Sequence, residues 1–168
     1  MTRPDERLDG RDAAHLRRAV ALAREALGRG NDPFGAVLVH EDGRVLAEGT
    51  NTEHTERDVT GHAESNLIRE ASRSIDAGTF ASSTLYASGE PCAMCSAAIF
   101  FAGVGRVVYG ASAARIQEIR GSSPDAGRPA LRLPIREVLA AGSRPTEVVG
   151  PALEEEAERV FEGPARWR

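Results

Sequence analysis

The chain has 168 residues, 41% of them hydrophobic, which is enough for one domain (residues 1–168) with a substantial core. No apolar run approaches the roughly 20 residues that span a bilayer, and the polar N-terminus has no signal-peptide core. We therefore expect a cytoplasmic protein without a membrane partner. The net charge of −4 and the lack of a basic cluster argue against a nucleic-acid partner.

The first half of the chain predicts a helix, a hairpin and a second helix. Apolar residues recur at helical spacing after Asp12, which we predict as the N-cap, and Asp42-Gly43 is a strong hairpin signal. The helices are predicted over residues 12–27 and 62–74, the strands over 34–40 and 44–48, and a polar loop over 49–61.

The second half alternates strands with helices, an order that implies parallel pairing of strands. Strands are predicted over 84–87, 106–110 and 146–149, helices over 92–102, 113–120, 135–141 and 151–161, and a long loop over 122–134. The whole order predicts an α/β fold with a five-stranded mixed sheet covered by helices on both faces. In such a sheet a site is expected at the carboxyl ends of the parallel strands.

Both cysteines of the chain stand in one Pro-Cys-x-x-Cys turn that follows a predicted strand and opens a helix. Cys92 and Cys95 are three positions apart, so both thiols lie on one helical face and can share a metal ion. The free N–H groups at a helix start also favour thiolate. Taken alone, the same turn fits a thioredoxin-like redox centre or a structural metal site.

Of the four histidines, His62 has the most informative neighbours, because Ala63 and Glu64 follow it directly. His-x-Glu followed by Pro-Cys-x-x-Cys is the signature of zinc deaminases. Ideal helical geometry puts residues two apart about 200° from each other, so His62 and Glu64 both reach a metal only if His62 occupies the first, non-helical position. A glutamate in the first turn of a helix can also be merely solvated.

The two motifs, over residues 60–64 and 90–95, resemble those of the cytidine deaminase superfamily, in particular its nucleobase-deaminase and tRNA-adenosine-deaminase branch. The resemblance covers residues 31–110 and implies a three-layer α-β-α sandwich. It implies zinc (Zn²⁺) held by His62, Cys92 and Cys95, with the fourth position left for water. Glu64 is then the catalytic carboxylate that carries the proton from water to the ring nitrogen and the departing amine.

The resemblance also suggests which residues contact the substrate. Asn51 is implied as an amide that pairs with the substrate ring, Phe34 and Ala63 as part of its pocket, and Glu90 as a support for the turn. An acidic residue that reads the ring's amino group is expected in the region of Glu118 and Asp125. His54 and Asp58 are candidates for the entrance. Trp167, a large apolar residue near the end of the chain, either covers the pocket or belongs to a disordered tail. A homodimer is implied as well.

We therefore predict a zinc-dependent hydrolase that removes an exocyclic amino group from a free nucleobase or a related amino-heterocycle, such as guanine, cytosine, isocytosine or an aminotriazine. A tRNA adenosine deaminase is the alternative within the same superfamily, and the acidic balance of the chain speaks against it. A noncatalytic, zinc-stabilised binding module is a more distant alternative, since it needs neither Glu64 nor an open coordination position.

Overall fold

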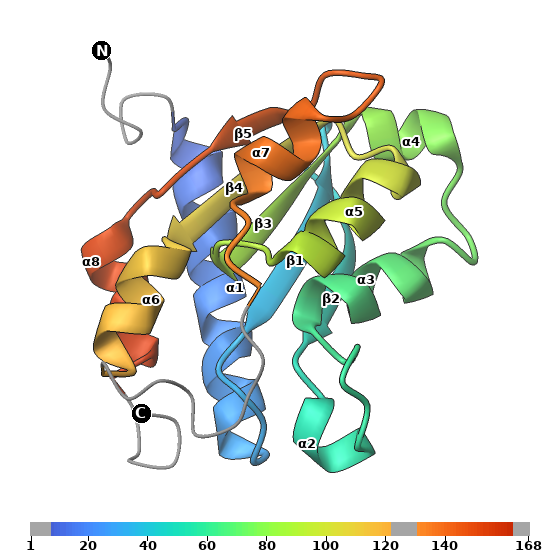
Figure 1. Ribbon diagram of the computed structural model, residues 1–168. Helices are drawn as coiled ribbons and strands as arrows, with labels where there is room; N and C mark the ends of the chain where they lie inside the picture. Colours follow the sequence, from blue (N-terminus) through green and yellow to red (C-terminus); the bar gives the residue numbers. More distant parts are fainter. Residues whose placement is uncertain (1–7, 122–130, 163–168) are drawn as a thin grey trace.

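A five-stranded mixed sheet forms the centre of the computed structural model, which describes residues 8–121 and 131–162 (Figure 1). The strands are β1 (Gly35–His40), β2 (Val45–Thr50), β3 (Ser83–Gly89), β4 (Arg106–Ala111) and β5 (Glu147–Val149). They lie in the order β2-β1-β3-β4-β5. β1 is antiparallel to β2 and β3, whereas β3, β4 and β5 run parallel.

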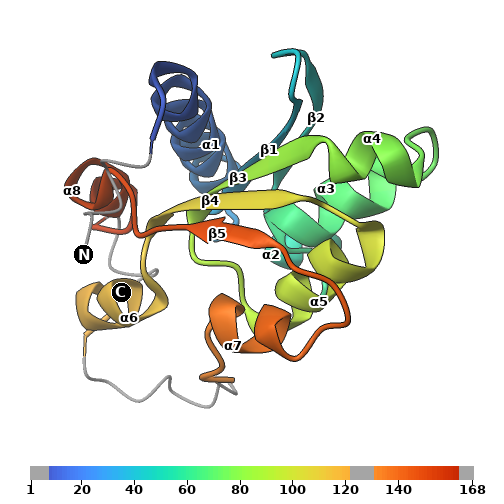
Figure 2. The same ribbon diagram turned by 90° about the horizontal axis from the view of Figure 1, so that it is seen from above.

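Helices cover both faces of the sheet, as Figure 2 shows. The helices are α1 (Gly10–Gly28), α2 (Glu53–Glu56), α3 (Ala63–Ala71), α4 (Ala77–Ala81), α5 (Ala93–Ala102), α6 (Ala113–Ile119), α7 (Ile135–Ala140) and α8 (Glu154–Ala157), with the 3-10 helix η2 (Glu158–Val160). Alternation along β1 sends Ala36 and Leu38 into the core with α3, α5 and α7, and Val37 and Val39 into the core with α1. The predicted five-stranded sheet between two helical layers is confirmed.

The helices differ from the sequence prediction in two respects. The helices α2 and α4 were not predicted, because each is too short for its apolar spacing to repeat. The last predicted helix, over 151–161, begins at Glu154 instead, after Leu153 adopts a positive φ of 48°. No helix among the described residues is long and apolar enough to cross a membrane.

The N-cap of α1 is Asp9, so the prediction of Asp12 as the cap was wrong. The two aspartates form a capping box, in which Asp9 accepts from the backbone N–H of Asp12 and the Asp12 carboxylate accepts from the N–H of Asp9. Asp12 is buried and also binds Arg106 and Tyr86, so it fastens α1 to the sheet.

Candidate metal centre and active-site cavity

One edge of the sheet collects the loops that carry the predicted site. β3 and β4 are parallel and end together, with Gly89 paired to Ala111. β1 runs the other way, and its first residue, Gly35, pairs with Thr50 at the end of β2. The residues just before β1, after β2 and after β3 therefore meet at the carboxyl ends of the parallel strands, where a site is expected.

His62 reaches this edge because it precedes α3 without belonging to it. It is the N-cap of α3, with an extended backbone (φ −74°, ψ 151°), and Glu64 is the second helical residue. The geometric condition for both side chains to face one metal is therefore met. Gly49 in β2 permits the close approach of α3, since a Cβ there would lie 2.3 Å from the carbonyl oxygen of Ala63.

Cys92 and Cys95 come to the same point from α5. Cys92 is the N-cap of α5 (φ −65°, ψ 170°), and Cys95 lies in its first turn, fully buried. One ligand atom from each of His62, Cys92 and Cys95 can be chosen so that all three lie within 4.8 Å of one another. The predicted cluster is confirmed as a group that is positioned to bind a metal ion.

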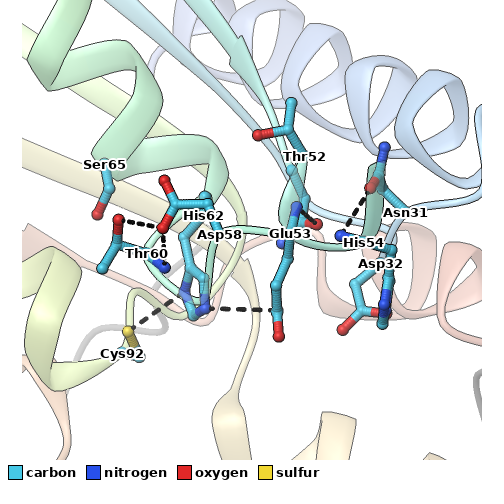
Figure 3. A network of polar contacts seen from close by, with 12 residues as sticks. Asn31, Asp32, Thr52, Glu53, His54, Asp58, Thr60, His62, Ser65 and Cys92 are labelled. Atoms are coloured by element: carbon cyan, nitrogen blue, oxygen red, sulfur yellow. Dashed lines mark hydrogen bonds and ion pairs between the residues drawn. The ribbon is translucent and has the colours of Figure 1, made fainter. Parts of the chain in front are cut away.

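The donor set fits zinc. One imidazole and two thiolates are typical zinc ligands, and three protein ligands leave a coordination position open, as catalytic zinc sites do. A hydrogen bond from the Cys95 thiol, helped by nearby His62, lowers the pKa of Cys92 to about 4. The hydrogen bond to Cys92 raises the pKa of His62, and Cys92 Sγ lies 3.5 Å from His62 Nδ1 (Figure 3). These contacts favour the thiolate form of Cys92, which is the form that binds metals.

Glu64 is buried beside this cluster, with 5% of its surface exposed. Burial, followed by the negative charge of Cys92, raises the pKa of Glu64 to about 7. A carboxyl group with a pKa near neutrality can both accept and donate a proton at physiological pH. Its position and its pKa suit the predicted proton carrier.

A cavity of about 630 Å³ opens next to the metal cluster, with His62 and Cys92 in its wall. Asn51, 1% exposed, also lines it, and the Asn51 side-chain oxygen accepts the backbone N–H of Glu53 at 3.1 Å. That bond fixes the amide with its oxygen occupied and leaves the NH₂ group as the donor for a bound molecule. The geometry suits the role predicted for Asn51.

Phe34 and Glu90 line the cavity too. The Phe34 ring packs against the buried ring of Phe161, with centroids 5.3 Å apart, beneath Gly89, where a Cβ would lie 3.2 Å from Phe34 Cε1. The Glu90 carboxylate accepts from the backbone N–H groups of Ala113 (3.0 Å) and Ile135 (3.3 Å). Glu90 thus joins the turn before α5 to the starts of α6 and α7, in keeping with a supporting role.

Several predicted substrate contacts do not lie at the cavity. Glu118 is 66% exposed and pairs with Arg115, because α6 turns it outward. Ala63 is buried at the start of α3, outside the cavity wall. His54 contacts the lining residue Asp32, with Nε2 2.9 Å from Oδ1, and Asp58 caps its own turn by accepting from Thr60. The remaining two candidates, Asp125 and Trp167, are outside the described residues.

Sequence reasoning missed two acidic residues that line the cavity together with Glu90, namely Asp32 and Glu53. Asp32 stands two residues before Phe34, and Glu53 stands two residues after Asn51, so both occupy loops at the edge where the site was expected. Their sequence neighbours carried no motif, but position in those two loops was a usable signal. Gln117 on α6 and Arg120 at its C-cap also line the cavity and were missed as well.

Comparison with known proteins agrees with this geometry. Residues 10–111 match the family described as cytidine and deoxycytidylate deaminase zinc-binding region. A probable cytosine deaminase of Schizosaccharomyces pombe is 38% identical over 153 residues, covering 89% of this chain and 90% of that protein. The guanine deaminase of Bacillus subtilis is 45% identical over 97 residues, covering 57% of this chain and 62% of that protein.

Solved structures share the fold. One, from a study of A-to-I editing by tRNA:A34 deaminases, is 31% identical with a TM-score of 0.66 and covers 88% of this chain and 99% of its own. A guanine deaminase from Nitrosomonas europaea is 23% identical with a TM-score of 0.70, covering 92% and 84%, and supports the fold. The chain belongs to the cytidine and deoxycytidylate deaminase family and carries the zinc-binding region of that family.

Proposed function

We propose that this chain is a zinc-dependent hydrolase that removes an exocyclic amino group from a free nucleobase or a related amino-heterocycle and releases ammonia. The observation that carries the proposal is the similarity to a probable cytosine deaminase along nearly the whole of both chains. Guanine, cytosine, isocytosine and aminotriazines are the candidate substrates.

The residues divide the chemistry between them. His62, Cys92 and Cys95 would hold the zinc, which when bound supplies a Lewis acid that lowers the pKa of water. Glu64 accepts one proton from the attacking water and delivers it to the ring nitrogen as the C–O bond forms. It then takes the remaining proton from the hydroxyl formed on the ring carbon and delivers it to the amino group, which leaves as ammonia as the C–N bond breaks and the carbonyl forms. Burial raises the pKa of this carboxyl group above its usual value, which favours proton exchange nearer to neutral pH.

Asn51 and Phe34 orient the substrate in this proposal. The Asn51 NH₂ group donates to an acceptor on the ring, and Phe34 supplies an apolar surface for the ring itself. The carbonyl and ring nitrogen acceptors of a nucleobase suit one fixed amide donor.

The charge of the cavity wall also favours a small substrate. It carries the carboxylates of Asp32, Glu53 and Glu90 against the guanidinium groups of Arg120 and Arg132. A protein that follows a phosphate backbone needs a basic surplus, since counterion release supplies much of the affinity. The volume of about 630 Å³ lies in the range of small-molecule sites, about 300–1,000 Å³.

A tRNA adenosine deaminase is the second candidate. The similarity to the tRNA:A34 deaminase structure over 88% of this chain favours it, as does a tRNA-specific adenosine deaminase of Haemophilus influenzae that is 39% identical over 101 residues. The homodimer expected from the resemblance is a further proposal for either enzyme, which sedimentation analysis would test.

Ammonia release separates the two candidates. Purified protein loaded with zinc is incubated with free bases, nucleosides, aminotriazines and transcribed tRNA, and inosine is measured in the tRNA. The proposal predicts turnover of at least one free base or aminotriazine. Inosine formation in tRNA without turnover of any free base would establish the second candidate instead.

A further inference from the structure

The ring of His62 lies between Cys92 on one side and Glu53 on the other (Figure 3). Its Nδ1 is 3.5 Å from Cys92 Sγ, and its Nε2 is 3.8 Å from Glu53 Oε2. The nitrogen that faces the metal cluster is therefore Nδ1, and the opposite nitrogen faces a carboxylate.

We infer that Glu53 is a positioning residue for the metal ligand His62, whose Nε2–H donates to the Glu53 carboxylate. The inference rests on the metal site of the proposed deaminase. A neutral imidazole that binds a metal through Nδ1 carries its proton on Nε2. Metal-bound histidines almost always donate that second N–H to a carboxylate, a carbonyl or water, which fixes the tautomer and the ring orientation.

The His62 ring and the Glu53 carboxylate are both partly shielded from water, so a protein acceptor for the Nε2–H matters here. The His62 side chain is 32% exposed and that of Glu53 is 19% exposed, so water reaches the pair only in part. Within the described residues, Glu53 is the one carboxylate found within ion-pair distance of His62 Nε2. The distance of 3.8 Å between His62 Nε2 and Glu53 Oε2 is longer than that of a hydrogen bond. A shift of about 1 Å in either side chain brings the two atoms within hydrogen-bond distance.

The backbone holds Glu53 in place. Its N–H donates to the Asn51 side chain, and the next two residues of α2 donate to the Asn31 side chain, at 3.1 Å from His54 N and 3.0 Å from Thr55 N. The first turn of α2 is thus tied to the segment before β1. A carboxylate on this turn is restrained to the side of the cavity where His62 stands.

Hydrogen bonds also hold the other end of the segment that connects β2 to α3 and contains α2. Thr52 N donates to Gly61 O at 2.8 Å, one residue before His62. The Asn66 side chain, on α3, donates to Thr50 O at 3.0 Å and to Thr52 Oγ1 at 2.9 Å. These bonds bring residues 53 and 62 side by side although the loop separates them in sequence, so the pair is a product of the local fold.

Zinc affinity and the His62 side-chain signal test the inference without any substrate. The variants are Glu53→Ala and Glu53→Gln. The control is Glu56→Ala, which removes the same charge from an exposed residue of α2 whose carboxylate accepts from the Thr52 hydroxyl. Zinc affinity is measured by competition with a chromophoric chelator, and the Nε2–H of His62 is followed by ¹⁵N-edited NMR of the zinc-loaded protein. Because neither readout needs turnover, a chain that deaminates nothing still tests this inference.

We expect Glu53→Ala to bind zinc about 10–100-fold more weakly and to change the Nε2–H resonance, with Glu53→Gln between it and the wild type. Glu56→Ala should match the wild type in both. Wild-type zinc affinity with an unchanged Nε2–H resonance in Glu53→Ala would overturn the inference. If Glu53→Ala does not fold, the same two readouts on Glu53→Gln decide.

Discussion

His62 and Cys92 stand 30 residues apart in sequence, yet Nδ1 and Sγ of the two lie 3.5 Å apart because each residue is the N-cap of its own helix. An N-cap has an extended backbone, so its side chain is free of the angular spacing within the helix. This arrangement explains how Glu64 and Cys95, one inside each helix, reach the same point. Two helix starts at one sheet edge therefore build the metal centre.

Zinc should be present at one ion per chain. Cys95→Ser and His62→Ala should each lose most of the metal, since two remaining ligands do not make a stable zinc site. Elemental analysis after gel filtration measures this, and Ser65→Ala, which removes only a contact to Cys95 Sγ at 3.3 Å, serves as the control. Full zinc content in Cys95→Ser would remove Cys95 from the ligand set.

Asn51→Asp should lower kcat/KM about 10–100-fold for whichever base is turned over, which corresponds to about 1–3 kcal/mol for a lost hydrogen bond. Aspartate keeps the oxygen that accepts the Glu53 N–H, so the loop is retained, but it cannot donate to the ring. Thermal melting and zinc content should stay at wild-type values. An unchanged kcat/KM would show that the Asn51 NH₂ group makes no contact with the substrate.

Sequence patterns predicted what depends on local signals. The sheet, its main helices and the metal cluster followed from periodicity, turns and two short motifs, and all three are present. Contacts between residues distant in sequence were harder to predict. Asp12 was predicted as a helix cap because the sequence does not show that it binds Arg106, 94 residues away.

The substrate side of the site was the hardest to predict. Glu118 was selected by its place in the sequence, but the rotation of α6 turns it to solvent and presents Gln117 and Arg120 to the cavity. Which face of a short helix points inward depends on packing, since its apolar residues are too few to define a face. Glu53 was not predicted for a similar reason, because its role depends on how the segment between β2 and α3 folds back toward His62.

Asp12 should contribute strongly to stability. It binds Arg106 through both oxygens, at 2.7 and 2.9 Å, and accepts from the Tyr86 hydroxyl at 2.7 Å. Asp12→Asn leaves Arg106 without its buried counter-charge and should lower the free energy of unfolding by about 3 kcal/mol. Denaturant unfolding at pH 7 measures this. The control Asp42→Asn, in an exposed pair with Arg44, should stay close to the wild type.

The same pair sets an acid dependence. Burial by itself would raise the pKa of Asp12, but hydrogen bonds from Arg106 and Tyr86 outweigh it and hold the pKa below its usual value. The unfolded chain then binds a proton more readily, so this stabilisation is present above about pH 4 and is lost as the pH falls further. The difference between wild type and Asp12→Asn should shrink in acid. A constant difference from pH 7 to pH 2.5 would contradict the assignment.

Truncation at Glu162 tests whether Trp167, which lies outside the described residues, acts as a lid on the cavity. Phe161 is fully buried against Phe34, so a chain that ends at Glu162 keeps this packing. If Trp167 covers the cavity and excludes water, its removal should raise KM or lower kcat several-fold at unchanged zinc content. Steady-state kinetics of the truncated chain and of Trp167→Ala check this. Wild-type kinetics in both would exclude a lid.

The most direct test of the account compares wild type with Glu64→Gln. Glutamine preserves the shape of the side chain but cannot exchange a proton, so the variant should keep one zinc per chain and its fold while kcat falls about 100- to 10,000-fold. Ammonia release from the best free base, measured on samples of known zinc content, gives the answer. Near wild-type turnover in the zinc-loaded variant would contradict the role of Glu64 and the proposed chemistry with it.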